Sequence, residues 1–311
     1  MTQQNLADKA IAATDAEPER PYKLFNVSLA RKVMLSPHLC RLTFRGSLMH
    51  EMSVDAPDQR IKLFFPAPSG EPSALPDDGS WMKAYQALAD EHRPARRTYT
   101  IRALRSDELD IDFVLHGETG PASKWAIRAE VGDTLQIVAP NAKFGRDAGG
   151  YEWSPPQGVR HALLIGDETA LPAIAGILET LAGQDVRPIV NAYVEVPSPD
   201  DCIALSAFPE LTLTWMPRGA GIRAGDLMIG AAGQAVLPVQ PAGATVVLPD
   251  INLDETIMWE KASAEAADIY VWVAGEAQAV KTMRRILIQE RGLDRKATNL
   301  MGYWRDGHVL D

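Results

Sequence analysis

Residues 96–126, RRTYTIRALRSDELDIDFVLHGETGPASKWA, determine the fold expected for the first half of the chain. Apolar and polar residues alternate in RTYTIR (97–102) and in DIDFVLH (110–116), which is typical of strands with one buried and one solvated face. The strands predicted in this half are residues 25–35, 40–46, 60–66, 97–104, 109–117 and 133–140. Six short strands with one clear helix between them, at 122–130, predict a closed antiparallel barrel.

The second half has a different pattern. Apolar runs such as 161–166 and 269–275 alternate with helical stretches such as 173–183, which is typical of a parallel sheet covered on both faces. The Gly/Pro-rich residues 145–160 are predicted to be a linker. We therefore expect the following organisation: a disordered tail at 1–20, a barrel domain at 21–147 and an α/β domain at 160–311.

Composition and charge exclude several classes of partner. The chain has 311 residues, of which 46% are hydrophobic and 23% charged, as in ordinary globular proteins. The net charge of −10 divides into −1 for residues 1–150 (19 Lys+Arg, 20 Asp+Glu) and −9 for residues 151–311 (12 Lys+Arg, 21 Asp+Glu). Without a basic stripe, neither a nucleic acid nor an anionic membrane surface is an expected partner.

The sequence also favours a cytoplasmic location. It has no apolar run of about 18 residues and no basic segment followed by an apolar one at its start, so neither membrane insertion nor secretion is expected. Cys40 and Cys202 lie in no CxxC pair and are interpreted as reduced thiols. The six histidines lack metal-ligand spacing, so we expect no metal site made by the protein.

The strand RTYTIR carries groups that suit a flavin. Arg97 and Tyr99 point to one side of this strand, and Thr98, Thr100 and Arg102 point to the other. A flavin needs an apolar or aromatic surface for its ring, hydrogen bonds at the ring edge and a cation at its phosphates. An exposed amphipathic strand without a ligand explains the same six residues.

The segment HGETGPASKWA (116–126) follows the next strand. Gly117 and Gly120 permit a tight turn, and Pro121 suits the first turn of a helix. Such a helix start binds a pyrophosphate through its free N–H groups and its dipole. A plain helix N-terminus is the alternative.

These motifs together resemble one family. RTYTIR followed by DIDFVLHGETGPASKWA resembles the RxY[ST] and GxxS flavin motifs of the ferredoxin–NADP reductase superfamily. The surrounding residues are similar to its siderophore-interacting proteins, the ferric-siderophore reductases. IGDETALPAI (165–174), WVAGE (272–276) and GYWRDG (302–307) match further signatures of that family in the same order. The resemblance therefore runs from about residue 25 to the end.

The resemblance implies a six-stranded flavin barrel followed by an NAD(P)H-binding domain. It also implies which residues bind FAD, position by position. These are Arg97, Tyr99 and Thr100 at the isoalloxazine and ribityl groups, Arg102 or Arg97 at the phosphates, His116 and Gly117 beside the ring, and Ala122, Ser123 and the Lys124 backbone at the pyrophosphate. Trp304, with Tyr303, would cover the flavin or lie near the substrate, although either residue could belong to the core.

For the nucleotide, the resemblance implies the loop that holds Gly166, Asp167, Glu168, Thr169 and Pro172, facing Ala274, Gly275 and Glu276 across a cleft. Carboxylates are poor neighbours for a phosphate, so Thr169 and backbone groups would face the nicotinamide, or one carboxylate would cap the following helix.

Arg218 is the candidate for the 2′-phosphate of NADPH, because a cation is what favours NADPH over NADH. An exposed loop arginine is an alternative reading, and Glu195 could instead accept a hydrogen bond from an NADH ribose.

The implied activity is that of an NAD(P)H-dependent ferric-siderophore reductase: NADPH, or NADH, gives a hydride to FAD, and single electrons then pass to Fe(III), which releases Fe(II). An anionic ferric chelate needs a local cationic patch, for which Lys62, Arg285 and Arg305 are the candidates. Two alternatives remain. One is an electron-transfer flavoprotein with a ferredoxin or free flavin as partner, and the other is a siderophore-binding protein without enzymatic activity.

Overall fold

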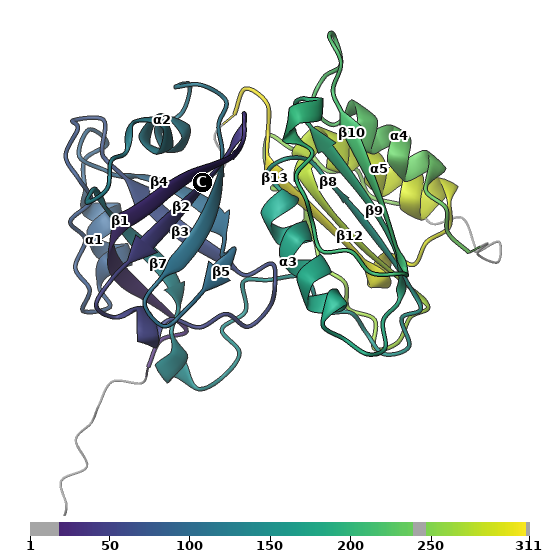
Figure 1. Ribbon diagram of the computed structural model, residues 1–311, viewed down its shortest axis with the longest axis horizontal. Helices are drawn as coiled ribbons and strands as arrows, with labels where there is room; N and C mark the ends of the chain where they lie inside the picture. The colour runs from purple at the N-terminus through teal and green to yellow at the C-terminus, as the bar shows by residue number, and fades with distance from the viewer. Residues whose placement is uncertain (1–18, 239–246, 309–311) are drawn as a thin grey trace, which may run out of the picture.

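The computed structural model describes residues 19–238 and 247–308 and places two β-sheets side by side (Figure 1). Nearly all of the expected tail at 1–20 lies outside the described residues. Among the residues that are described, no helix has the length and apolar character needed to cross a membrane.

The first sheet is antiparallel and has seven strands. They are β1 (Tyr22–Ser36), β2 (Leu39–Arg45), β3 (Arg60–Phe65), β4 (Ala95–Thr100), β5 (Ala103–Leu104), β6 (Leu109–Val114) and β7 (Thr134–Pro140). Their order is β4-β3-β7-β1-β2-β6-β5. The prediction of six strands is corrected here, because the expected strand at 97–104 is interrupted after Thr100 and counts as two.

Residues 95–104 form both edges of this sheet. Their first part, β4, pairs with β3, and their last part, β5, pairs with β6. Between the two, the Ile101 N–H donates to the Gln59 carbonyl (2.8 Å) and the Arg102 N–H to the Asp110 carbonyl (2.9 Å). One continuous segment therefore joins the two edges and curls the sheet into a barrel.

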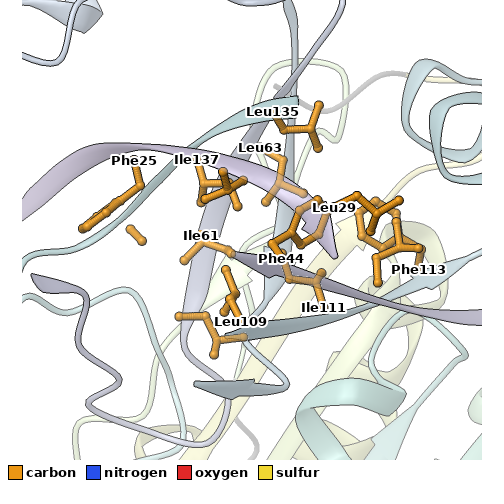
Figure 2. Close-up of a cluster of buried hydrophobic side chains, with 14 of the residues drawn as sticks. Phe25, Leu29, Phe44, Ile61, Leu63, Leu109, Ile111, Phe113, Leu135 and Ile137 are labelled. Carbon is orange, nitrogen blue, oxygen red and sulfur yellow. The ribbon is translucent and has the colours of Figure 1, made fainter. Parts of the chain in front are cut away.

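The barrel is filled by alternate strand residues. Figure 2 shows Phe25, Leu29, Phe44, Ile61, Leu63, Leu109, Ile111, Phe113, Leu135 and Ile137 converging in its interior. Helix α2 (Pro121–Arg128) covers one end, where the Trp125 ring stacks on Phe44 with centroids 6.1 Å apart. The short helix α1 (Trp81–Ala87) packs outside the barrel against Phe64. Trp125, which is partly buried, thus packs against the barrel core.

The second sheet is parallel except at one edge. Its strands are β8 (His161–Gly166), β9 (Ile189–Val196), β10 (Leu211–Pro217), β11 (Trp259–Glu260), β12 (Ile269–Glu276) and β13 (Thr298–Trp304). Their order is β10-β9-β8-β12-β13-β11, and β11 runs antiparallel to β13. The sheet is therefore mixed, because the chain adds this two-residue edge strand to the expected parallel ladder.

Helices cover both faces of the second sheet. Helix α3 (Leu171–Ala182) lies on the face toward the barrel, and α4 (Asp226–Gln234) and α5 (Ala277–Arg284) lie on the opposite face (Figure 1). A π-helix at Arg285–Glu290 continues α5. The described part of the chain also has four short 3₁₀ helices, at Met49–Glu51, Ala142–Phe144, Pro199–Asp201 and Arg295–Ala297.

Helix α3 brings the two halves into close contact. A Cβ at Gly176 would lie 2.7 Å from the Pro57 carbonyl oxygen, so only glycine allows the helix backbone to approach this barrel loop so closely. On the same helix, Glu179 forms an ion pair with Arg102 of the barrel. Leu39 of β2 packs in the same apolar cluster as the buried face of α3.

A second contact between the halves is centred on Asp201. The Ser36 hydroxyl (2.7 Å), the His38 N–H (3.0 Å) and the His38 ring (Nδ1, 2.8 Å) in the β1–β2 turn all contact its carboxylate. Ser198 adds its N–H (3.0 Å) and hydroxyl (2.7 Å) from the same 3₁₀ helix region. Burial acts to raise the pKa of Asp201, but the hydrogen bonds from Ser198, Ser36 and His38 prevail and lower it to about 2.

This contact predicts an acid-sensitive contribution to stability. Because the folded-state pKa of Asp201 lies below its ordinary value of 3.8, the contribution is present above that value and is lost as the pH falls toward about 2. Asp201→Asn should therefore be less stable than the wild type at neutral pH, and the difference should shrink on acidification. Urea unfolding at a series of pH values measures it. Asp200→Asn, at the exposed neighbour, is the control, and a pH-independent loss would contradict the prediction.

Candidate functional site

The predicted flavin strand has one aromatic and one polar side. The Tyr99 ring lies 4.3 Å from the Phe113 ring and also contacts Phe65, and burial raises the pKa of its hydroxyl. Thr100 is buried and lies opposite Arg60 in the β3–β4 register. Arg97 donates from its guanidinium to the Arg96 carbonyl (2.7 Å). The Tyr99 ring therefore packs against the barrel core.

Arg102 lies where the barrel meets α3. Its guanidinium pairs with Glu179 of that helix and lies 3.8 Å from Asp112. Arg102 and Asp112, with Arg41 and Leu171, line a cavity of about 210 Å³ between the two halves. In this structure Arg102 contacts carboxylates, and its assignment to the flavin phosphates stays a prediction.

The turn before α2 is held by one hydroxyl. Ser123 is buried, its Oγ donates to the Gly117 carbonyl (2.7 Å) and it accepts from the His116 N–H (3.2 Å). Gly117 has φ +80°, a conformation that favours glycine. The His116 ring contacts the Thr119 hydroxyl (2.7 Å). Ser123 thus fixes the shape of the turn at the residues predicted to lie beside the flavin.

The start of α2 offers N–H groups at this turn. The helix begins at Pro121, its N-cap is Gly120, and no side chain caps it. The Lys124 N–H already donates to the Gly120 carbonyl (2.9 Å), so the N–H groups of Ala122 and Ser123 are the better partners for an anion. Helix α2 contacts β4, the strand that carries most of the predicted flavin motif.

At the carboxyl edge of the second sheet, Asp167 joins three strand ends. It is fully buried, and its Oδ1 accepts from the N–H (2.9 Å) and hydroxyl (2.5 Å) of Thr169. Its Oδ2 accepts from the Glu276 N–H (2.9 Å) and the Trp304 indole (2.7 Å). Burial, together with the charge of Glu168, raises the pKa of Asp167 to about 7. Asp167 and Trp304 therefore organise the loop before α3.

Gly275 and Glu276 complete this edge. A Cβ at Gly275 would lie 2.6 Å from Oδ2 of Asp167, so glycine is needed for the close approach of β12. Glu276 is buried and caps α5, because its carboxylate accepts from the Ala279 N–H (2.8 Å). Its side chain serves the helix, and its assignment to the nucleotide stays a prediction.

Arg218 is enclosed by two carboxylates. Its guanidinium donates to both oxygens of Glu168 (2.8 and 2.6 Å) and to Glu195 (2.8 Å). Glu195 in turn accepts from the N–H groups at the start of α4, at Gly225 (2.8 Å), Leu227 (3.0 Å) and Met228 (3.1 Å). The structure therefore brings together Glu168, Glu195 and Arg218, which the sequence suggested separately.

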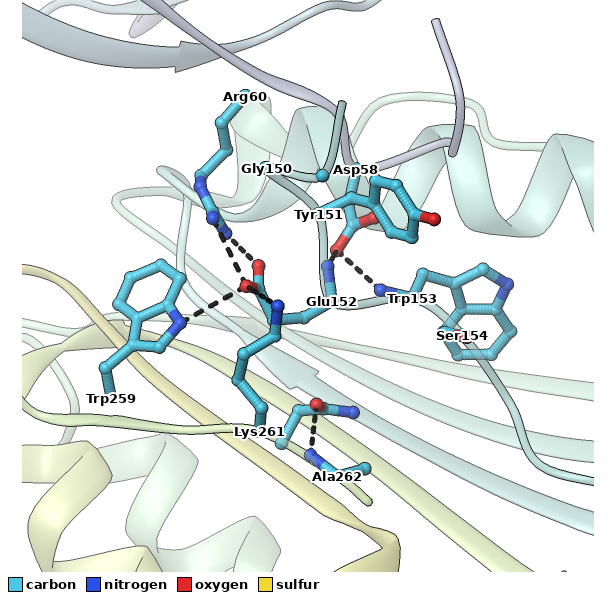
Figure 3. A network of polar contacts seen from close by, with 12 residues as sticks. Asp58, Arg60, Gly150, Tyr151, Glu152, Trp153, Ser154, Trp259, Lys261 and Ala262 are labelled. Atoms are coloured by element: carbon cyan, nitrogen blue, oxygen red, sulfur yellow. Dashed lines mark hydrogen bonds and ion pairs between the residues drawn. The ribbon is translucent and has the colours of Figure 1, made fainter. Parts of the chain in front are cut away.

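Sequence reasoning missed a polar network at the linker (Figure 3). The Glu152 carboxylate, buried in the linker, pairs with Arg60 and Lys261 and accepts from the Trp259 indole (3.3 Å). The Asp58 carboxylate accepts from the N–H groups of residues 152 and 153 (3.0 and 2.9 Å). The sequence signal that could have found it is the pair of carboxylates, Asp147 and Glu152, in the Gly/Pro-rich linker. This network attaches the linker to both halves.

Tyr303 extends this network as a partly buried residue whose hydroxyl oxygen is buried. The Tyr303 ring stacks on the Trp259 indole, with ring centroids 5.9 Å apart. The Arg60 guanidinium also lies over the Trp259 indole, 4.5 Å from its centroid. Burial raises the pKa of the Tyr303 hydroxyl. Tyr303 thus packs against the core of the second half, beside the linker.

The structure does not gather the three predicted docking cations in one place. Lys62 lies on β3 and donates to the Thr98 hydroxyl (2.6 Å). Arg285 follows α5, on the sheet face turned away from the barrel, and pairs with Glu290. Arg305 pairs with Asp254 (2.7 Å). Only Lys62 lies on the barrel.

Comparison with family models matches both halves of the chain. Residues 28–144 match the siderophore-interacting FAD-binding domain, and residues 159–307 match the siderophore-interacting protein model.

Known relatives match over nearly the whole chain. An uncharacterized protein of Mycobacterium tuberculosis is 32% identical over 93% of this chain and 92% of its own length. The ferric vibriobactin reductase ViuB of Vibrio cholerae is 30% identical over 94% and 92%. The NADPH-dependent ferric-chelate reductase of Escherichia coli is 25% identical over 89% and 91%.

A solved structure has the same arrangement. The siderophore utilization protein from T. fusca superposes with a TM-score of 0.70 and 28% identity, covering 94% of this chain and 96% of that one.

Proposed function

The chain belongs to the siderophore-interacting protein family, and from this premise we propose that it is an FAD-dependent reductase that takes electrons from a reduced pyridine nucleotide and reduces the iron of a ferric siderophore. Residues 21–147 would be the FAD-binding domain and residues 160–311 the nucleotide-binding domain. The names of the relatives that are known as ferric reductases support the substrate class.

The observation that carries the proposal is that the helix following the turn at 116–120 contacts the predicted flavin strand. The uncapped start of α2, next to the turn held by the Ser123 hydroxyl, suits a pyrophosphate. The contact between α2 and β4 supports a site in which the rest of FAD would reach Tyr99 and Thr100. These groups are the donors and the aromatic surface that FAD requires.

Within this site the chain binds and orients. Ala122 and Ser123 would hold the pyrophosphate through their N–H groups, while Tyr99 and Thr100 would contact the ring and ribityl chain and Arg97 would supply a cation. When bound, FAD accepts a hydride and passes on single electrons, so the protein itself needs no acid or base for the electron transfer. Lys62, on the outer face of β3 beside Thr98, would attract an anionic ferric chelate.

One experiment tests this function directly. The FAD-loaded protein is mixed anaerobically with NADH or NADPH while the absorbance near 450 nm is followed, and ferric catecholate, hydroxamate or citrate is then added. We expect the absorbance to fall with a nucleotide and to recover with at least one ferric chelate. If neither nucleotide bleaches the flavin, or if no ferric chelate restores the absorbance, the proposal is wrong.

The Ser123 hydroxyl gives a sharper test of the FAD site. Ser123→Ala removes both hydrogen bonds that hold the turn, so we expect the affinity for FAD to fall about tenfold, as for the loss of one well-placed hydrogen bond. Titration of apoprotein with FAD, followed by flavin fluorescence, measures the dissociation constant. Ser106→Ala, at an exposed site, is the matched control. An unchanged affinity would show that the turn does not contact the cofactor.

A further inference from the structure

Arg218, Glu168 and Glu195 form a closed cluster that we call the acidic clamp. The guanidinium contacts Glu168 through two hydrogen bonds (2.8 and 2.6 Å) and Glu195 through one (2.8 Å). Only 14% of the Arg218 side chain and 13% of the Glu168 side chain are exposed, and none of the Glu195 side chain. One positive and two negative charges therefore share one small volume, with a net charge of −1.

The acidic clamp lies at the edge where a dinucleotide is expected. The strand order reverses between β8 and β12, and ligands of such sheets bind outside the carboxyl ends of the strands at this point. Glu168 follows β8, Glu195 ends β9, and Arg218 follows β10. A dinucleotide with its nicotinamide at the reversal would reach the clamp with its adenosine half.

The two carboxylates of the clamp differ in what else they do. Glu195 accepts from three N–H groups at the start of α4, so it cannot turn toward a ligand without leaving that helix uncapped. Glu168 lies in the loop after β8 and is the partly exposed member of the pair. Glu168 is therefore the group that a nucleotide would meet first.

From this arrangement we propose that Glu168 determines nucleotide specificity by disfavouring a 2′-phosphate, so that the protein prefers NADH over NADPH. The inference rests on the proposed function and deepens it. A 2′-phosphate would approach a cluster with a net negative charge. In this cluster both terminal nitrogens of Arg218 already donate hydrogen bonds to the Glu168 carboxylate. A ribose 2′-hydroxyl can instead donate a hydrogen bond to the Glu168 carboxylate.

The test uses the adenosine half alone, so that it does not depend on turnover. Binding of adenosine 2′,5′-bisphosphate and of 5′-AMP to the FAD-loaded protein is measured by calorimetry. For the wild type we expect weaker binding of the bisphosphate than of 5′-AMP. In Glu168→Gln the affinity for the bisphosphate should rise about tenfold while that for 5′-AMP stays within about twofold. Glu265→Gln, at an exposed site, removes the same charge elsewhere and should change neither.

A double variant identifies the cation responsible. Glu168→Gln with Arg218→Gln leaves Glu195 on its three N–H partners, and the gain for the bisphosphate should disappear. If the gain persists there, or if Glu265→Gln reproduces it, the inference is wrong. The same holds if 5′-AMP binds and Glu168→Gln changes nothing. If neither ligand binds any variant, the nucleotide site of the proposed function fails together with the inference.

Discussion

Glu195→Ala should lower the free energy of unfolding by about 4 kcal/mol, because removing one partner of a buried ion pair typically costs 3–5 kcal/mol. The change leaves three N–H groups of α4 without an acceptor and leaves Arg218 with Glu168 alone. Glu195→Gln keeps an acceptor oxygen and should lose roughly half as much.

Urea unfolding, followed by tryptophan fluorescence, measures the loss at Glu195. The control is Glu255→Ala, because Glu255 is exposed and its substitution should change the free energy by less than about 0.5 kcal/mol. A loss at Glu195 as small as that of the control would mean that α4 does not depend on this carboxylate. Glu195 would then again be open as a partner for a nucleotide ribose.

Gly176→Ala should have the second largest effect and should lower the free energy of unfolding, although helix propensity alone would raise it. Alanine favours a helix over glycine by about 1 kcal/mol at an open position. At Gly176, however, the new Cβ would lie 2.7 Å from the Pro57 carbonyl oxygen, and such overpacking costs about 1–3 kcal/mol. We therefore expect a net loss of about 1–2 kcal/mol and a looser contact between α3 and the barrel.

Gly230→Ala is the matched control for this substitution. Gly230 lies in α4, and a Cβ there would meet nothing within 4 Å, so the variant should be more stable by about 0.5–1 kcal/mol. Thermal unfolding of both variants, with limited proteolysis of the 145–160 linker, checks the pair. A stabilised Gly176→Ala would show that the two halves do not press together at Pro57.

The sequence predicted the elements better than their contacts. Alternation placed the flavin strand within two residues, but it could not show the break after Thr100, because that break depends on which partner strand each half of the segment finds. Likewise, the run of residues 122–130 predicted α2 because its apolar period is local. Both patterns depend on residues that are neighbours in the chain, so the sequence alone is enough to predict the strand and the helix.

Contacts between distant segments were not predictable in the same way. The sequence identified Arg218 as a cation, but the partners that neutralise it, Glu168 and Glu195, lie 50 and 23 residues away. In the network at the linker, the partners of Glu152 lie even farther along the chain: Arg60 is 92 residues away and Trp259 is 107 residues away. Charge and size can be read from one residue, whereas its partner is set by the tertiary fold.

The segment 95–104, which forms both edges of the first sheet, has a consequence for folding. The residues proposed to contact the flavin ring and ribityl chain, Tyr99 and Thr100, lie on the segment whose placement closes the barrel, so this part of the cofactor site forms only when the barrel closes. A chain that has not closed has no place for FAD, and ligands that bind only the native state shift the folding equilibrium by mass action. Cofactor supply would therefore govern how much of this protein is folded, as well as how much of it is active.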